Sequence, residues 1–175
     1  STHGVGLAGV MSGLETEVEN DTKNIIIESA IFDSVKVRLT AKKILRSEAS
    51  NRFEKGIDPA RTTMAIERAC KLLEQYADGK VITGTVEYDK TNSQEKNIEI
   101  EFKNINEVLG TIIPNEEILN VFRKLGFEYT VNGEKVKVKV PTRRLDISIK
   151  EDLIEEVSRI YGVDNIQGKL PVVPM

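Results

Sequence analysis

The segment FEYTVNGEKVKVKV, residues 127–140, constrains the fold more than any other part of the sequence. Its Asn132-Gly133 pair is the strongest short-range signal for a two-residue hairpin turn, because both turn residues take a positive φ. After the turn, valines alternate with lysines, so one face of this strand is buried and the other is solvated: Val136, Val138 and Val140 against Lys135, Lys137 and Lys139. The sequence therefore predicts an antiparallel β-hairpin that Pro141 ends.

Helical patterns surround this hairpin. Apolar residues recur at helical spacing on both sides of it, and Gly110, Gly126 and Gly162 each stand where a helix is expected to end. The expected elements are a strand at 98–102 and helices at 104–109, 114–125 and about 149–161.

The first half of the chain has weaker patterns. Short apolar runs predict strands at 24–30 and 80–89, and helices are expected at 33–45 and from Pro59 to about Ala77. The Gly-rich stretch 4–14 matches neither a dinucleotide fingerprint nor a phosphate-binding loop. The polar run that follows Asp89 predicts a boundary. The expected organisation is a first domain at 1–90, a linker at 91–97 and a second domain at 98–175.

Composition limits the kinds of site that are possible. The 175 residues carry a net charge of −3 and are 39% hydrophobic, which suits a soluble globular protein without an overall nucleic-acid-binding surface. The single Cys70 excludes an intramolecular disulfide and fits a reducing compartment. With one histidine, His3, no His-based triad is complete. No stretch approaches the roughly 20 apolar residues of a membrane span, and no secretory leader is visible.

The polar stretch SEASNRFEKGIDP, residues 47–59, predicts either a surface loop or the polar wall of a binding pocket. Arg52 and Glu54 are expected to brace it by ion pairing, and Phe53 to anchor it in the core rather than to stack on a base. Cys70, on the apolar side of the next helix, is interpreted as an inert core thiol. The lysines of the hairpin either protect an edge strand from aggregation or contact RNA phosphates.

Carboxylates gather on the last helix. At 100° per residue, Asp152, Glu155 and Glu156 fall within an arc of about 100°, and Asp146 could fold back onto the first turn. Two readings stay open. An acidic face near a helix N-terminus is favoured by the helix dipole alone, whereas converging carboxylates would also suit a hard divalent cation such as Mg²⁺.

The segment RRLDISIKEDLIEEVSRIYGVDNI, residues 143–166, resembles the signature of the bacterial phenylalanyl-tRNA synthetase beta subunit. Upstream, LAGVMSG (7–13), IIIESAIFD (25–33) and RSEASNRFEKGIDP (46–59) resemble successive motifs of the same family, in order. The resemblance covers essentially the whole chain. It implies an α+β chain: the C-terminal part of an α/β tRNA-editing module, followed by a small winged-helix-like domain with a β-hairpin.

The family resemblance implies a cytoplasmic two-subunit ligase that joins phenylalanine to its tRNA with ATP. An alpha subunit carries the synthetic site, and the beta subunit hydrolyses tyrosine wrongly attached to that tRNA, in a heterotetramer of two alpha and two beta chains. It also implies Mg²⁺ at the interface with alpha, held by the acids that match Asp146, Asp152, Glu155 and Glu156.

The resemblance carries the editing pocket over only in part. Its matching positions are Glu28, Ser47, Ala49, Ser12 and Gly13, with Ser12 standing where the family's pattern has glycine. Ser47 and Ala49 are small, and Glu28 is interpreted as the acceptor that selects the tyrosine hydroxyl. The editing histidine of the family lies upstream, and His3 does not match it. No catalytic set is complete, so this segment alone is expected to be inactive.

Two other functions remain as alternatives. One is a free-standing nucleic-acid-binding module, which would need a basic recognition helix, whereas the helix at 149–161 is acidic. The other is a structural docking module without chemistry.

Overall fold

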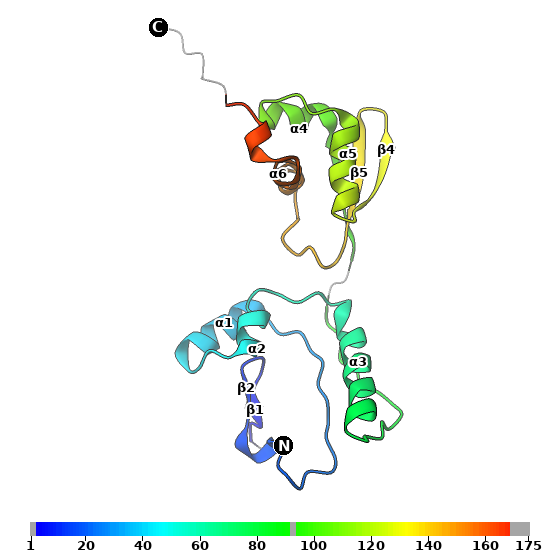
Figure 1. Ribbon diagram of the computed structural model, residues 1–175. Helices are drawn as coiled ribbons and strands as arrows, with labels where there is room; N and C mark the ends of the chain where they lie inside the picture. The colour runs from blue at the N-terminus through cyan, green and yellow to red at the C-terminus, as the bar shows by residue number, and fades with distance from the viewer. Residues whose placement is uncertain (1–2, 92–93, 169–175) are drawn as a thin grey trace. The chain divides into compact units, whose positions relative to one another are not determined.

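The computed structural model describes residues 3–91 and 94–168 of the chain. The chain divides into two compact units, residues 1–93 and 94–175, which are described separately (Figure 1). Of the predicted linker, residues 92 and 93 lie outside the described residues, as do residues 169–175 at the end of the second predicted domain. Within the described ranges, no helix combines the length and apolar character needed to cross a membrane.

The second unit is built on a three-stranded antiparallel sheet. Its strands stand in the order β3 (Lys96–Glu101), β5 (Lys135–Val140) and β4 (Glu128–Asn132). The register places Val138 opposite Ile98 on one side and Tyr129 on the other. Gly133 takes a φ of +60° in the turn. The predicted hairpin is confirmed and the buried valines favour its register, but its two turn residues are Gly133 and Glu134, because Asn132 pairs with Lys135 at the end of the ladder.

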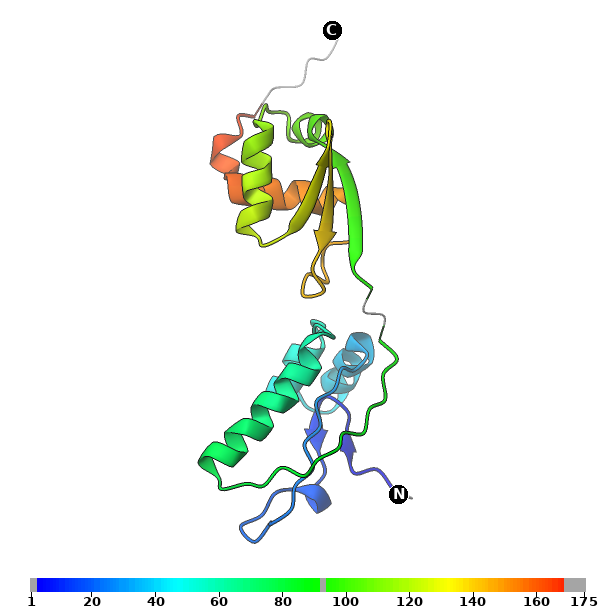
Figure 2. The same cartoon turned by 90° about the vertical axis from the view of Figure 1, so that its right-hand side faces the viewer.

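Three helices complete this unit: α4 (Phe102–Leu109), α5 (Asn115–Lys124) and α6 (Lys150–Tyr161), followed by the short helix η2 (Val163–Asn165). Figure 2 shows α5 and α6 on one side of the sheet. The core between them contains Ile98, Ile100, Phe102, Ile105, Ile113, Ile118, Val121, Phe122, Phe127, Val136, Val138, Val140, Ile147, Leu153, Ile154 and Val157. The predicted helices of this half are confirmed, whereas its winged-helix-like arrangement stays a prediction.

The expectation that the lysines of β5 protect an edge strand is wrong, because β5 is the central strand. Lys135 forms ion pairs with Glu99 and Glu101, at 3.3 and 3.6 Å. Lys139 pairs with Glu95 at 2.9 Å and Glu128 at 3.2 Å. These cross-strand pairs raise the pKa of both lysines. The solvated face of the sheet is therefore a ladder of mixed charge.

The first unit contains the helices α1 (Ser34–Lys43), α2 (Glu48–Phe53) and α3 (Arg61–Tyr76). A small ladder pairs β1 (Gly6–Leu7) with β2 (Met11–Ser12), and the short helix η1 (Leu14–Thr16) follows. Both units together make a mixed helix and sheet protein with small antiparallel sheets, consistent with the α+β class. The buried apolar residues of this unit form one small cluster, in which the rings of Phe32 and Phe53 meet edge-on at 5.0 Å: Val10, Val37 and Ala41, with Phe32 and Phe53 packed against them.

Several predictions for this unit are wrong. The segments 24–30 and 80–89 form no strands, and Ile26 and Val86 are fully exposed. A strand needs hydrogen bonds from a neighbouring strand, and no strand of the described residues pairs with either segment. The stretch 47–59 is not only loop, because a capping box between Ser47 and Ser50 starts α2.

The two helices at 33–45 and 59–77 are confirmed as α1 and α3, but α3 has no buried residue. Cys70 is half-buried rather than a core thiol. Arg52 pairs with Glu48 at 3.5 Å, and Glu54 with Arg46 at 3.8 Å, which confirms the predicted ion pairs.

The core assignment of the second unit predicts unequal effects from two identical substitutions. Ile118→Ala, at a fully buried position of α5, should lower the free energy of unfolding by about 3 kcal/mol, because it leaves a cavity. Ile112→Ala, at a position 88% exposed, should change it by about 0.5 kcal/mol or less. Urea unfolding followed by circular dichroism measures both. Equal losses would contradict this core.

Candidate functional site

Glu156 of α6 is the buried member of the acidic set, at 7% exposure. Its Oε2 accepts hydrogen bonds from Arg144 Nη1 at 3.1 Å and Arg159 Nη2 at 2.6 Å, and its Oε1 accepts one from Arg159 Nε at 3.2 Å. Arg144 and then Arg159 lower the pKa of Glu156, because both guanidinium groups favour its charged form. The carboxylate is therefore buried as the centre of an ion-pair network.

Arg144 also holds Asp146. Its Nε donates to Oδ1 at 2.9 Å and its Nη2 to Oδ2 at 2.5 Å, a two-point contact. The guanidinium lies 5.7 Å from the centre of the Phe127 ring, and the Arg144 side chain is only 17% exposed. This contact lowers the pKa of Asp146 below its usual value. One guanidinium thus joins the loop before α6 to the helix itself.

Asp152 and Glu155 have other environments. The Oδ2 of Asp152 accepts hydrogen bonds from the backbone N–H of Ser148 at 2.6 Å and of Ile149 at 3.0 Å. These bonds at the start of α6 lower the pKa of Asp152, as expected for an acid that caps a helix. Glu155 is exposed on the next turn. The structure therefore brings Asp146 and Glu156 together through Arg144 and gives Asp152 a capping role.

The carboxylate oxygens of the four acids are chemically suited to Mg²⁺, but their arrangement in this structure is not. All four positions offer carboxylate oxygens, which are the ligands that Mg²⁺ prefers. However, the oxygens of Asp146 and Glu156 already accept guanidinium N–H groups. Among the described residues, no three or more His, Cys, Asp or Glu side chains are grouped so that they could hold a metal ion.

The arginines are the functional residues that the sequence analysis missed. Arg159 lies three residues after Glu156, a spacing at which helical side chains meet. Arg144 lies two residues before Asp146, in an irregular segment, so only the fold could reveal its contact with Glu156. The Arg143-Arg144 pair beside the acids was the available signal.

The residues matched to the editing pocket are only partly assembled. Ser12 and Gly13 line an open hollow of the first unit, with Gly4, Gly6, Leu7, Met11, Ile44 and Leu45. A Cβ atom at Gly13 would lie 2.6 Å from the carbonyl oxygen of Val5, so the close backbone approach falls at Gly13 and not at Ser12. The serine side chain is exposed and compatible with this ladder.

Ser47 is not among the residues that line this hollow. Its hydroxyl donates to the carbonyl oxygen of Val10 at 2.5 Å and accepts from the backbone N–H of Ser50 at 3.1 Å. Glu28 and Ala49 are exposed and are not among the described residues that line the hollow. Glu28 lies in an irregular segment that Ser29 ties to α3, by a 2.8 Å hydrogen bond to the carbonyl oxygen of Thr62.

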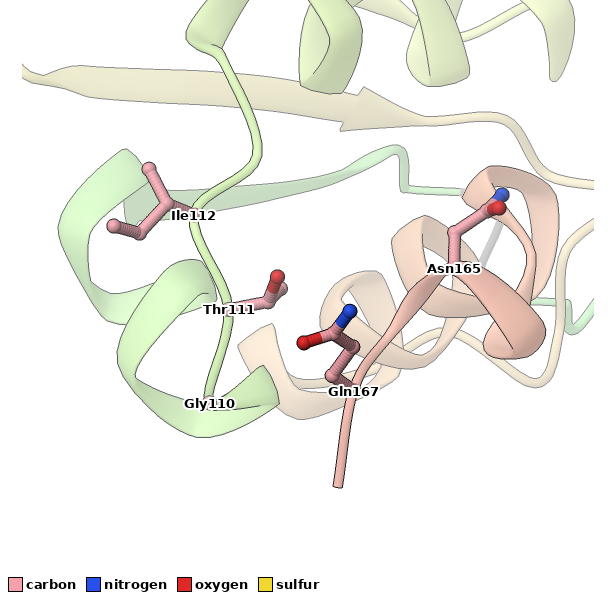
Figure 3. A pocket seen from close by; sticks show the side chains of 5 residues that line it. All are labelled: Gly110, Thr111, Ile112, Asn165 and Gln167. Atoms are coloured by element: carbon pink, nitrogen blue, oxygen red, sulfur yellow. The ribbon is translucent and has the colours of Figure 1, made fainter. Parts of the chain in front are cut away.

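A second hollow lies in the other unit, between the residues that follow α4 and the segment that runs from the end of η2 to Gln167 (Figure 3). The side chains of Thr111 and Gln167 point toward one another there, beside Asn165, which donates to the carbonyl oxygen of Tyr161 at 2.7 Å. None of the residues that line it is charged or belongs to the predicted sites: Gly110, Thr111, Ile112, Asn165 and Gln167.

Comparison with known proteins connects both units to one family. A family model described as the B3/4 domain matches residues 1–78, and one described as the tRNA synthetase B5 domain matches residues 98–163. The chain is 48% identical to the phenylalanine–tRNA ligase beta subunit of Bacillus subtilis (strain 168) over 171 residues, which are 97% of this chain and 21% of that protein. The chain carries the B3/4 and B5 domains of a phenylalanyl-tRNA synthetase beta subunit.

A second curated relative agrees with these matches. The chain is 49% identical over 169 residues to the phenylalanine–tRNA ligase beta subunit of Staphylococcus haemolyticus (strain JCSC1435), covering 96% of this chain and 21% of that protein. A solved N-terminal fragment of the phenylalanyl-tRNA synthetase beta subunit from Pyrococcus horikoshii is 28% identical, with a TM-score of 0.37, over 39% of this chain and 20% of that one. The chain thus spans about a fifth of the length of the curated relatives.

The buried ion pairs predict a stability effect confined to one of two adjacent glutamates. Glu156→Gln should lower the free energy of unfolding by about 2 kcal/mol at neutral pH, because it removes the charge between two arginines. Glu155→Gln, at the exposed neighbouring position, is the control and should stay within about 0.5 kcal/mol. Denaturant unfolding at pH 7 measures both.

The stability difference between wild type and Glu156→Gln should depend on pH. A carboxyl group whose folded-state pKa is lowered contributes stability above its unfolded-state pKa, and this contribution is lost as the pH falls through the folded-state pKa. The folded-state pKa of Glu156 is lowered, so the difference between wild type and Glu156→Gln should shrink below about pH 4. A difference that persists unchanged at pH 2 would contradict the role of the charge.

Proposed function

We propose that the chain is a part of the beta subunit of phenylalanine–tRNA ligase that contributes to an editing pocket and to a contact with the alpha subunit. The observation that carries the proposal is similarity through both units, 48% identity over 97% of the chain. The complete enzyme would join phenylalanine to its tRNA with ATP, in the cytoplasm, as a heterotetramer of alpha and beta chains. This segment alone would be inactive, because it offers no complete catalytic set.

The editing role assigns different tasks to the matched residues. Glu28 would accept a hydrogen bond from a tyrosine hydroxyl, and phenylalanine would leave that acceptor desolvated and unpaired. The segment that carries Glu28 is anchored by Ser29 to α3 and by Phe32 against Phe53. These two contacts hold the backbone on the C-terminal side of Glu28.

Ser47 would shape the wall of the pocket rather than bind the substrate, because both of its hydrogen bonds are to the backbone. Ala49 and Ser12 would leave room beside it, and Gly13 would allow the two chain segments to approach closely.

The acids of the second unit would hold Mg²⁺ where the alpha subunit docks. The ligands we propose are Asp146, Asp152, Glu155 and Glu156. Support comes from their carboxylate chemistry and from two exposed apolar side chains beside them, Leu145 at 45% and Ile149 at 54%. A docking partner would remove these apolar side chains from water.

No observation favours a free-standing nucleic-acid-binding module. The helix α6 carries acids, and the lysines Lys135 and Lys139 of the sheet are paired with glutamates.

The editing proposal predicts that Glu28→Ala in the complete ligase lowers the rate of tyrosyl-tRNA deacylation about 100-fold, since the site loses the acceptor that distinguishes tyrosine from phenylalanine. Deacylation of purified tyrosyl-tRNA and aminoacylation with phenylalanine are measured on the same preparation, and aminoacylation should be unchanged.

Glu17→Ala, which removes another exposed glutamate of the same unit, is the matched control and should deacylate at the wild-type rate. Wild-type deacylation by Glu28→Ala would reject the role of Glu28.

The metal proposal predicts that Glu155→Gln and Asp152→Asn weaken the Mg²⁺-dependent association of alpha and beta at least about 10-fold, because each removes an oxygen ligand of a hard cation. Association is measured by calorimetry with and without Mg²⁺.

Glu151→Gln, an exposed neighbour on α6, serves as the control for general loss of negative charge. Association that ignores both Mg²⁺ and these two substitutions would remove the metal from the proposal.

A further inference from the structure

We propose that the outward side of α1 is an RNA-docking surface, on which basic side chains contact the phosphate groups of the tRNA backbone. This surface, called the basic face below, consists of four exposed cations: Lys36, Arg38, Lys42 and Lys43. The inference rests on the proposed function in one respect, namely that the ligase acts on tRNA. It adds a contact outside the residues matched to the editing pocket and outside the acids of α6.

The charge of α1 differs from that of the rest of the chain. The stretch SVKVRLTAKKILR, residues 34–46, contains five lysines and arginines and no aspartate or glutamate, although the whole chain has a net charge of −3. Each of the other α-helices among the described residues contains at least one glutamate. Positive charge concentrated on one helix is the electrostatic footprint of a surface that binds a polyanion.

The two sides of α1 separate these cations from the core. Val37 and Ala41 are buried, at 3% and 2% exposure, and hold the helix against the small core of the first unit. At 100° per residue, the four cations fall on the other sides of the helix in two rows. Between the rows lie Val35 and Leu39, each 52% exposed. The cations therefore point to solvent around a narrow apolar strip.

The acids near α1 have other partners. α1 lies against α2 (Figure 1), where Glu48 pairs with Arg52 at 3.5 Å and Glu54 with Arg46 at 3.8 Å. Asp33 caps the start of α1, where its carboxylate accepts a backbone N–H at 2.9 Å. Within the part of the chain that the structure describes, no side chain of the basic face forms an ion pair. Their charge is thus uncompensated within this unit.

The stability of the helix does not account for this arrangement. Lys36 lies in the first turn, where the helix dipole disfavours a cation. Arg38 and Lys42 are four residues apart, a spacing at which like charges repel each other. Only Lys42 and Lys43, in the last turn, suit the dipole. A polyanion along the basic face would relieve the repulsion within it.

The basic face ends beside the open hollow of the first unit. Ile44 and Leu45, the two residues that follow α1, line this hollow together with Ser12 and Gly13. A nucleic-acid strand held by the last turn of α1 would therefore lie next to the residues matched to the editing pocket. This second observation connects the cations to a place where a ligand fits.

RNA suits this surface better than a lipid membrane does. A helix that lies in a membrane interface buries a broad apolar face, whereas the apolar strip of the basic face is made of Val35 and Leu39, both half-exposed. The relatives at 48% and 49% identity are named phenylalanine–tRNA ligase beta subunits. A nucleic-acid backbone carries a negative charge at every phosphate, so charge complementarity favours tRNA as the occupant.

The test compares three forms of the complete ligase: wild type, Arg38→Gln/Lys42→Gln, and Arg68→Gln/Lys71→Gln. The last form is the matched control, because it removes one exposed arginine and one exposed lysine from α3 of the same unit. Binding of deacylated tRNA is measured by fluorescence anisotropy over a series of salt concentrations.

We expect the α1 variant to bind tRNA at least about fivefold more weakly at low salt, and its slope of log Kd against log salt to be smaller by about 1 to 2, because it loses phosphate contacts and the counterions that they release. The α3 control should stay within about twofold of wild type. An α1 variant with the affinity and slope of wild type overturns the proposal, as does an equal loss in both variants.

A lipid partner is tested with vesicles of phosphatidylserine and phosphatidylcholine. We expect the α1 variant and wild type to bind these vesicles alike. If the α1 variant keeps its tRNA affinity but loses vesicle binding, the basic face recognises lipid and the proposal is overturned.

A further measurement needs no variant, so it decides the matter even if the substituted ligase fails to fold. The lysines of wild type are acetylated briefly with and without tRNA, and their modification is read by mass spectrometry. Lys36, Lys42 and Lys43 should react at least about threefold more slowly when tRNA is bound, because phosphate contact shields their amines, whereas Lys71 should react at the same rate. Unchanged reaction of all three lysines overturns the proposal.

The editing proposal and this inference can fail separately. If Glu28→Ala deacylates tyrosyl-tRNA at the wild-type rate while the α1 variant loses tRNA affinity and salt dependence, the role of Glu28 fails and the docking surface stands. If Glu28→Ala loses deacylation while the α1 variant binds tRNA as wild type does, the role of Glu28 stands and the docking surface fails.

Discussion

The ion pairs of the buried Glu156 carboxylate are the interaction on which the arrangement of the second unit depends. A charge at 7% exposure is tolerated only if it is paired. The arginines that pair with Glu156 also hold neighbouring parts of the unit in place. Arg144 reaches it from the irregular segment between β5 and α6, so this segment is held against the helix. Arg144 also covers the ring of Phe127, which leads from α5 into β4. The ion pair therefore connects the polar surface to the apolar core.

The two units differ in the size of the buried apolar core that holds their elements together. In the second unit, helices and sheet share one continuous core, and each helix contributes buried residues to it. In the first unit, the buried cluster joins the β1–β2 turn, α1 and α2 through a few residues, and α3 has none. The position of Glu28 consequently depends on single contacts such as that of Ser29 with Thr62. Groups held by so few contacts are those whose arrangement a ligand can most easily change.

What the sequence predicted well was determined locally. The hairpin turn and the glycines that end α4 and α5 need only nearby residues, and these elements form as expected except that the turn residues are Gly133 and Glu134. The predicted strands at 24–30 and 80–89 failed because strand formation depends on a partner, which an apolar run does not specify. The central place of β5 was missed for the same reason, since the pairing with β3 joins residues far apart in sequence. At the acidic site, the positions of the carboxylates on α6 followed from helical spacing, but the contact between Arg144 and Glu156 required the fold.

Asp146 and Glu156 place two negative charges near one another, and Arg144 is the cation that lies between them. Two carboxylates that share a site repel each other, and either a guanidinium or a metal ion removes this repulsion. Arginine is suited to relieve this repulsion because its planar guanidinium reaches both carboxylates at once, which a lysine ammonium could not do with the same geometry. Glu156 is fixed in a helix, and Asp146 lies in an irregular segment with its side chain 65% exposed, so the contacts of Arg144 with both acids are what ties this segment to α6.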